Sequence, residues 1–230
     1  TSKSQTDRYM NKLALYALVA MAPLLSAATV SSGHLYGYYK DGIYTAPGKL
    51  FRVSSPFPDE PTVSDGREPA NNNAGALSFI DSAGRLLGVL YMDNKGAGSG
   101  ADADAAKQIG SWFRDTGFPG FFRASVPDAK ILREAPGEIG GQPAWIAVAY
   151  LPKSSPIGQV VPHSYELIRN DSWRGMAVVA RGKRYYVLQT ELRIEKLTDR
   201  NFRFDAEAAD WNAFVPELEA LYDRIEFLKP

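Results

Sequence analysis

Short apolar segments alternate with polar turn sequences along much of this chain, as is typical of β-strands joined by tight turns. Such segments cover residues 43–45, 50–53, 76–80, 86–92, 131–134, 144–150, 165–169, 176–180 and 185–192. Short turn sequences join neighbouring segments, including Asp81 to Arg85 and Arg181 to Arg184, and each contains a glycine that accepts a positive φ. The pattern predicts a mainly antiparallel sheet built largely from hairpins.

A helical period replaces this alternation at two places. In the first, Asp102 is a suitable N-cap and Gly117 a suitable end, so we expect one helix between them. Its apolar face comprises Ala103, Ala106, Ile109, Gly110 and Phe113.

The second helical segment lies near the C-terminus, where an apolar stripe must pack on another apolar surface. Pro216 either kinks this helix or occupies the first turn of a new one. The stripe consists of Trp211, Phe214, Leu218, Leu221, Tyr222 and Ile225. Together with the strands, the two helices predict an α+β fold, a mainly antiparallel sheet flanked by helices.

Three segments read as irregular structure. Residues 56–75 hold four prolines and three consecutive asparagines, which predicts a long surface loop. Residues 94–101 are rich in glycine, and residues 31–40 are rich in serine, glycine and tyrosine. We expect residues 94–101 to be a flexible connection and residues 31–40 to be a tether.

The N-terminal region carries the features of an export signal. Arg8 and Lys12 precede thirteen uncharged residues, Leu13 to Leu25, and small residues follow through Ala28. We expect residues 1–28 to be an N-terminal extension with a signal peptide cleaved after Ala28, or with an uncleaved anchor; a buried core helix is the third interpretation. The stretch before Ala28 also resembles a lipoprotein box in which alanine stands at the position of the lipidated cysteine.

Composition sets the class of protein and its organisation. The chain has 230 residues, of which 45% are hydrophobic, and this suffices for a packed core. We expect a tether at residues 29–41 and a single globular α+β domain at residues 42–230. The 26 basic residues balance 26 acidic ones, so the chain has no overall field for nucleic acid, and none is expected as a partner.

Three short motifs and their order give the chain a family resemblance. These are residues 140–144 (GGQPA), 182–188 (GKRYYVL) and 222–227 (YDRIEF), which follow an early hairpin rich in tyrosine and phenylalanine. In this layout the chain resembles the PsbP-like superfamily over about residues 42–228, while the insertion at residues 94–100 departs from the pattern. The resemblance implies an α/β/α sandwich with a binding or assembly role, and it carries over no catalytic residue.

The residues needed for common catalytic and metal sites are scarce. The chain has no cysteine and two histidines, His34 and His163, which are far apart and outside any metal-ligand spacing. The Gly96 to Gly100 stretch lacks the ending of a phosphate-binding loop, and no GxSxG elbow is present. Asp93, Asp102 and Asp104 do not follow calcium-loop spacing. We therefore expect no catalytic residue, no cofactor and no metal.

Candidate partner-binding residues fall into two groups. The first is the basic turn of the second hairpin with its adjacent tyrosine: Arg181, Lys183, Arg184 and Tyr185. This group suits an acidic or phosphorylated partner. The second is the tyrosine-rich entry to the domain, from which we select Tyr38 and Tyr39; half of these tyrosines should pack on the sheet and half should be exposed.

Three functional hypotheses remain open. The first is an exported, periplasmic or envelope-associated binding or assembly protein without catalysis, whose partner is another envelope protein met by residues 56–75 and 93–101. The second is a secreted inhibitor or immunity protein that blocks an enzyme with the same segments. The third is a hydrolase with an unrecognised carboxylate site, which requires a concave site with converging titratable groups.

Overall fold

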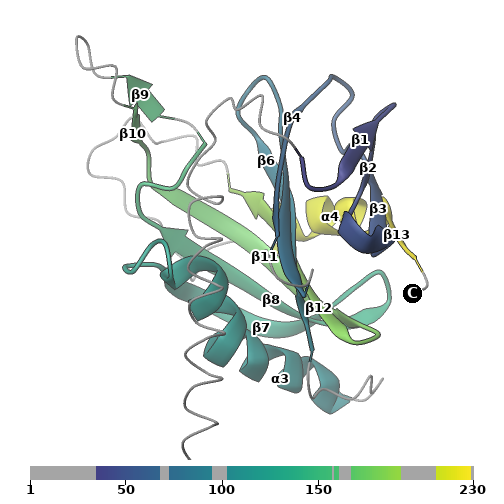
Figure 1. Cartoon of the computed structure of the whole chain (residues 1–230). Helices are drawn as coiled ribbons and strands as arrows, with labels where there is room; N and C mark the ends of the chain where they lie inside the picture. The colour runs from purple at the N-terminus through teal and green to yellow at the C-terminus, as the bar shows by residue number, and fades with distance from the viewer. Residues whose placement is uncertain are drawn as a thin grey trace, which may run out of the picture.

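An antiparallel sheet of seven strands forms the centre of the described structure (Figure 1). The computed structural model describes residues 35–67, 73–94, 103–156, 158–160, 167–192 and 211–228. In spatial order the strands of this large sheet are β4 (Thr62–Arg67), β5 (Ala74–Ile80), β6 (Leu86–Asp93), β12 (Arg184–Glu191), β11 (Ser172–Arg181), β8 (Gln142–Leu151) and β7 (Lys130–Ile139).

One face of the large sheet is covered by helix α4 (Trp211–Tyr222) and a small four-stranded sheet (Figure 1). The small sheet has the order β1 (Tyr38–Lys40), β2 (Ile43–Thr45), β3 (Phe51–Ser54) and β13 (Ile225–Phe227), and the short helix η1 (Pro47–Lys49) lies between β2 and β3. Its inner side chains, including Tyr44, Phe51 and Val53, share a core with Phe214 and Leu218 of α4.

The other face is covered by one continuous helical segment, composed of α3 (Ala103–Trp112), η2 (Phe113–Gly117) and η3 (Pro119–Arg123). Its aromatic residues pack with Trp145 and Met176 of the sheet in a second core. A separate ribbon of β9 (Gly158–Val160) and β10 (Leu167–Arg169) extends from the large sheet (Figure 1). Helices on both faces of an antiparallel sheet confirm the expected α+β sandwich.

Two glycines let the helices approach the sheet closely. A Cβ at Gly110 of α3 would lie 2.5 Å from the ring of Trp145 on β8. A Cβ at Gly175 of β11 would overlap the ring of Phe214 on α4. At both positions the missing side chain is replaced by an aromatic ring from the facing element, so the two layers interlock.

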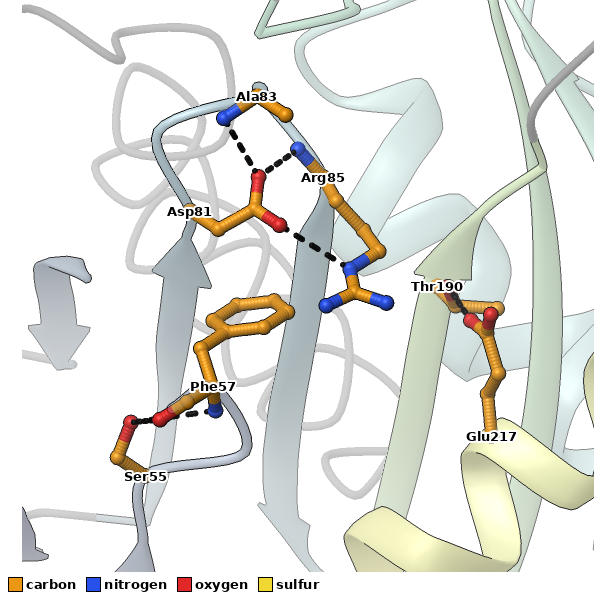
Figure 2. Close-up of polar contacts among 7 residues, drawn as sticks. All are labelled: Ser55, Phe57, Asp81, Ala83, Arg85, Thr190 and Glu217. Atoms are coloured by element: carbon orange, nitrogen blue, oxygen red, sulfur yellow. Dashed lines mark hydrogen bonds and ion pairs between the residues drawn. The ribbon is translucent and has the colours of Figure 1, made fainter. Parts of the chain in front are cut away.

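Polar contacts fix the turn between β5 and β6 and the position of α4 (Figure 2). Asp81 accepts hydrogen bonds from the backbone nitrogens of Ala83 and Arg85, at 3.0 and 2.7 Å, and from Nε of Arg85 at 3.2 Å. The guanidinium of Arg85 lies 4.6 Å from the ring centre of Phe57, which ties the segment before β4 to this hairpin. Across the sheet, Thr190 Oγ1 donates to Glu217 of α4 at 2.8 Å.

The predicted hairpins and both predicted helices are confirmed, but two helix ends were placed wrongly. The first helix does not stop at Gly117, because wider turns carry it on to Arg123: the nitrogen of Phe118 bonds to the oxygen of Phe113, five residues earlier. Burial of the aromatic side chains outweighs the usual effect of Gly117 and Pro119. The final helix ends at Tyr222, and Ile225 begins β13 instead.

The long surface loop predicted at residues 56–75 is also wrong, because β4 lies within it and β5 begins at Ala74. The prolines flank β4 and none lies inside it, so its hydrogen bonds to β5 are intact. Similarly, the last three residues of the segment predicted as a tether form β1. The leader at residues 1–28, His34, His163 and residues 95–102 lie outside the described residues.

Candidate basic groove

A groove lies between the helical segment η2–η3 and the start of β7, with a volume of about 510 Å³. Strand β7 is at the edge of the large sheet, so within the described ranges no further strand covers this side of it. The groove is lined by Arg114, Phe118, Arg123, Lys130, Ile131, Leu132, Arg133 and Glu134. Most of these side chains are charged, and all but one of the charged ones are basic.

A β-bulge shapes the strand side of the groove. Ile131 is opposite Ala149 and Arg133 is opposite Val148, so Leu132 is an extra residue on β7. A bulge bends its strand and redirects the side chains on either side of it. Leu132 is consequently 37% exposed at the groove, which gives this basic site an apolar element.

Two of the lining side chains, Arg114 and Glu134, contact each other and also Trp145 of β8. Glu134 accepts a hydrogen bond from Nε1 of Trp145 at 2.7 Å and one from Arg114 at 3.2 Å. The guanidinium of Arg114 also lies 5.0 Å from the ring centre of Trp145. Because each side chain contacts the other two, Arg114 is held at the groove in a defined orientation.

Arg123 of η3 and Lys130 of β7 also line the groove. Nε of Arg123 donates to the carbonyl of Ala129 at 3.2 Å, and its guanidinium lies 5.5 Å from the ring centre of Phe118. Lys130 is exposed at the first position of β7. Arg133 lines the groove, but its guanidinium lies over the ring of Trp211 on α4, at 4.6 Å.

The groove therefore presents three cationic head groups, from Arg114, Arg123 and Lys130, against the single carboxylate of Glu134. A concave surface with this excess of positive charge attracts carboxylates or phosphates. Pairing of an added strand with β7 is disfavoured, because Pro136 has no N–H and the bulge interrupts the edge. Recognition at this site thus depends on side chains.

The hairpin residues predicted as a partner site do not form one exposed cluster. Arg181 donates to the hydroxyl of Tyr222 at 2.8 Å, and Arg184 pairs with Asp93 at 2.8 Å. Tyr185 is buried and stacks on Trp112 with ring centres 4.0 Å apart. Lys183 is exposed at the turn. Most of this cluster thus has contacts within the fold.

The two selected tyrosines of the domain entry point to opposite faces of the small sheet. Tyr38 is 62% exposed, whereas Tyr39 is half-buried and contacts Phe79 of the large sheet. Tyr44 is buried as well, and Tyr36 is exposed, so the predicted division into packed and exposed tyrosines is confirmed. The β11–β12 turn lies near one edge of the small sheet, since the guanidinium of Arg181 is 5.6 Å from the ring centre of Phe227 on β13. Strand β1, which carries Tyr38 and Tyr39, is at the opposite edge of that sheet, so the two predicted groups are not brought together (Figure 1).

The basic groove was not predicted from the sequence. Its cations come from the helical segment and from β7, and no short motif contains them. The only local signal is the recurrence of arginine and lysine between positions 114 and 133, which by itself is typical of any solvated surface.

Metal-ligating residues do not gather in the part of the chain that the structure describes: no group of three or more histidine, aspartate or glutamate side chains is placed to hold an ion. In the same residues no helix has the length and apolar character needed to cross a bilayer.

Comparison with known proteins gives matches to solved structures alone. No protein-family model matches this chain, and no curated protein does. The solution structure of cyanobacterial PsbP from Synechocystis sp. PCC 6803 is similar over 86% of this chain and 99% of its own, with a TM-score of 0.43 and 11% identity.

Two further solved structures are similar to this chain. A protein from Bacteroides thetaiotaomicron matches over 83% of this chain and 50% of its own, with a TM-score of 0.41 and 8% identity. A protein of unknown function from Pseudomonas aeruginosa matches over 72% and 88%, with a TM-score of 0.28 and 11% identity. One of the three is a PsbP protein, and all three likenesses concern the fold alone.

Proposed function

We propose that this protein is an exported, non-catalytic binding module of the cell envelope, which holds an acidic segment of a partner protein in the basic groove. The observation that carries the proposal is the groove itself, where Arg114, Arg123 and Lys130 surround an exposed Leu132. The export part of the proposal depends on the apolar leader between Leu13 and Leu25.

The chemistry of the lining favours binding over catalysis. A hydrolase site needs a general base or a nucleophile beside the groups that stabilise charge. Here the one carboxylate at the groove, on Glu134, already accepts hydrogen bonds from Trp145 and Arg114. The groove thus offers fixed positive charge and an apolar contact, which suit a carboxylate-bearing peptide.

Leu132 supports a peptide rather than a small inorganic anion as the ligand. A phosphate or sulfate ion has no apolar surface to place against an exposed leucine. A peptide with an acidic residue next to an apolar one would satisfy both features of the groove at once. The length of β7, from Lys130 to Ile139, also lets basic and apolar contacts follow each other along one direction.

A binding measurement with charge-reversed variants tests the proposal. The probe is a fluorescent peptide of about eight residues that alternates glutamate and leucine, and its anisotropy is recorded against the full chain. Reversal of either groove cation, in Arg123→Glu or Lys130→Glu, should weaken binding by about tenfold, because repulsion replaces attraction near the peptide. Both side chains are exposed, so the fold should be retained.

Lys183→Glu is the matched control, because Lys183 is an exposed cation at the turn of the other basic cluster. It should leave the affinity unchanged. If Lys183→Glu lost binding while the two groove variants kept it, the peptide site would be at the β11–β12 turn and not at the groove. Equal weakening in all three variants would show attraction by net charge alone, and either result contradicts the proposal.

A further inference from the structure

The outer face of the small sheet carries an unusual concentration of exposed aromatic and aliphatic side chains. Tyr36, Tyr38 and Ile43 are 53%, 62% and 43% exposed. They are three of the five large hydrophobic side chains that are exposed within the described residues. Apolar groups gathered on one face in this way mark a contact surface.

Strand register shows that Tyr38 and Ile43 share one face, while Tyr36 precedes β1. Tyr38 is opposite Thr45, Thr45 is opposite Arg52, and Arg52 is opposite Glu226, so the four form one row across the sheet. In the next row Lys40 is opposite Ile43, which is opposite Ser54. Successive side chains of a strand alternate between faces, and Tyr39, Tyr44 and Val53 accordingly point into the core.

Basic residues accompany the tyrosines on this face. Lys40 is exposed beside Ile43, Arg52 is half-exposed in the row of Tyr38, and the guanidinium of Arg67 lies 5.1 Å from the ring centre of Tyr36. Two carboxylates oppose them: Glu226 lies 3.7 Å from Arg52, and Asp41 follows Lys40. Asp65 of β4, which accepts hydrogen bonds from the backbone nitrogens of Tyr36 and Gly37, is a third carboxylate beside this face, so cations and anions are equal in number. Tyrosine with lysine or arginine is the combination found at the headgroup level of membranes.

The chain itself brings this face close to the apolar leader. The described structure begins at Leu35, one residue before Tyr36, and nine residues separate it from Leu25 at the end of the apolar run. A fully extended connection of that length spans at most about 35 Å. If residues 13–25 stay in a bilayer as an uncleaved anchor, the start of β1 must remain near the bilayer surface.

We propose that the outer face of the small sheet, centred on Tyr38 and Ile43, rests on lipid headgroups beside the N-terminal anchor. The anchor holds the domain at the bilayer, the tyrosines and Ile43 enter the interface, and Lys40 and Arg52 face lipid phosphates. In Figure 1 the helical segment of the groove lies on the other side of the large sheet from β1 and β2, so a membrane-bound domain would keep its groove accessible.

The absence of cysteine from the chain allows a direct test. Tyr38→Cys in the full chain is labelled with a fluorophore and reconstituted into vesicles of phosphatidylcholine with roughly 30% phosphatidylglycerol, an anionic lipid. Brominated lipids then quench a label that enters the interface. The matched control is Asp128→Cys, an exposed position between η3 and β7. We expect quenching at position 38 to exceed that at position 128 by about threefold or more, since only the first label lies at interface depth.

A second pair of substitutions tests whether quenching at position 38 comes from contact of this face with lipid or only from the nearby anchor. Tyr36→Ser and Ile43→Ser, added together to the labelled Tyr38→Cys chain, remove exposed apolar groups and leave the core unchanged. Quenching at position 38 should then fall by about half or more, because the apolar contact is lost. Unchanged quenching in this variant, or equal quenching at positions 38 and 128 in the singly labelled chains, would each overturn the proposal.

Discussion

The hydroxyl of Tyr44 on β2 donates a hydrogen bond to Oδ2 of Asp65 on β4 at 2.5 Å, and this contact joins the small sheet to the edge of the large one. The same carboxylate accepts hydrogen bonds from the backbone nitrogens of Tyr36 and Gly37, at 3.0 and 2.7 Å. Asp65 is only 8% exposed. A buried carboxylate is tolerated where donors converge on it in this way.

Tyr44→Phe should therefore destabilise the protein. The variant removes one of the donors to a buried carboxylate and keeps the ring in the core, so the cost should be about 1–3 kcal/mol in the free energy of unfolding. Urea denaturation followed by circular dichroism measures it. A change of less than about 0.5 kcal/mol would mean that the two backbone donors satisfy Asp65 without the tyrosine.

Tyr91 provides the matched contrast to Tyr44. It is also buried, yet its hydroxyl has no hydrogen-bond partner among the described residues. Tyr91→Phe removes an unsatisfied polar group and should be neutral or stabilising by up to about 1 kcal/mol. The same denaturation experiment measures this value, and a loss as large as that of Tyr44→Phe would show that the Tyr91 hydroxyl does have a partner.

Tyr91 also predicts a loss of stability at alkaline pH. Burial, with the negative charge of Asp65, raises the pKa of Tyr91 from 10.0 to about 12. Between these values the folded state keeps a proton that the unfolded state releases, so stability is full below pH 10.0 and falls as the pH rises through 12. Thermal unfolding of the parent chain and Tyr91→Phe should diverge in this window, with the variant losing less. Parallel curves would contradict the assignment.

The close approach of α3 to the sheet gives a prediction in which two effects have opposite signs. Alanine is favoured over glycine inside a helix by up to about 1 kcal/mol. In Gly110→Ala, however, the new Cβ would meet the Trp145 ring, which hydrogen bonds and ring contacts hold at Glu134 and Arg114. We expect a net loss of about 1–3 kcal/mol in the free energy of unfolding.

Gln108→Ala on the same helix is the control for Gly110→Ala, because Gln108 is exposed. Chemical denaturation should place this control within about 0.5 kcal/mol of the parent. A Gly110→Ala chain more stable than the parent would show that the helix moves away from Trp145 at little cost.

Local chemistry made part of this fold predictable. The turn from Asp81 to Arg85 was recognised because its residues act within the turn itself, where Asp81 bonds to the backbone of Ala83 and Arg85. The tyrosine-rich entry was expected to divide between core and solvent, and Tyr39 and Tyr44 do point inward.

The errors arose where distant contacts outweigh local preference. The prolines and asparagines of residues 56–75 suggested a loop, but β4 forms within it, where the donors from Tyr44 and from the chain at residues 36–37 make the buried Asp65 acceptable. Gly117 suggested a helix end, but burial of the neighbouring phenylalanines on the sheet keeps the chain helical. The basic groove depends on which elements meet at the edge of the sheet, and no local pattern specifies that.

Arg174 on β11 is fully buried at the far end of the α3 face and gives the last prediction. Its guanidinium donates to Ser172, to Gln189 and to the carbonyl of Ser154, at 3.2, 2.8 and 3.0 Å. Glu191 is opposite Arg174 across the β11–β12 pair. Burial lowers the pKa of Arg174 and raises that of Glu191, and each charge opposes the shift of the other.

Arg174→Met should cost about 3–5 kcal/mol at neutral pH, because it removes three buried hydrogen bonds and also the positive charge that acts on the half-buried Glu191 carboxylate. The raised pKa of Glu191 sets the sign of the pH dependence. The folded state binds the proton more tightly than the unfolded state, so the Glu191 contribution is full below the ordinary value of 4.5 and is lost as the pH rises through the folded pKa. Without Arg174 this loss grows, so the difference in free energy of unfolding between Arg174→Met and the parent chain should be smaller at pH 4 than at pH 7.

Denaturation of two variants at pH 4 and pH 7 checks this: Arg174→Met alone, and Arg174→Met combined with Glu191→Gln. Adding Glu191→Gln should recover stability at pH 7 and recover little at pH 4. Recovery of the same size at both values would show that the cost comes from the lost hydrogen bonds of Arg174 and not from the charge of Glu191.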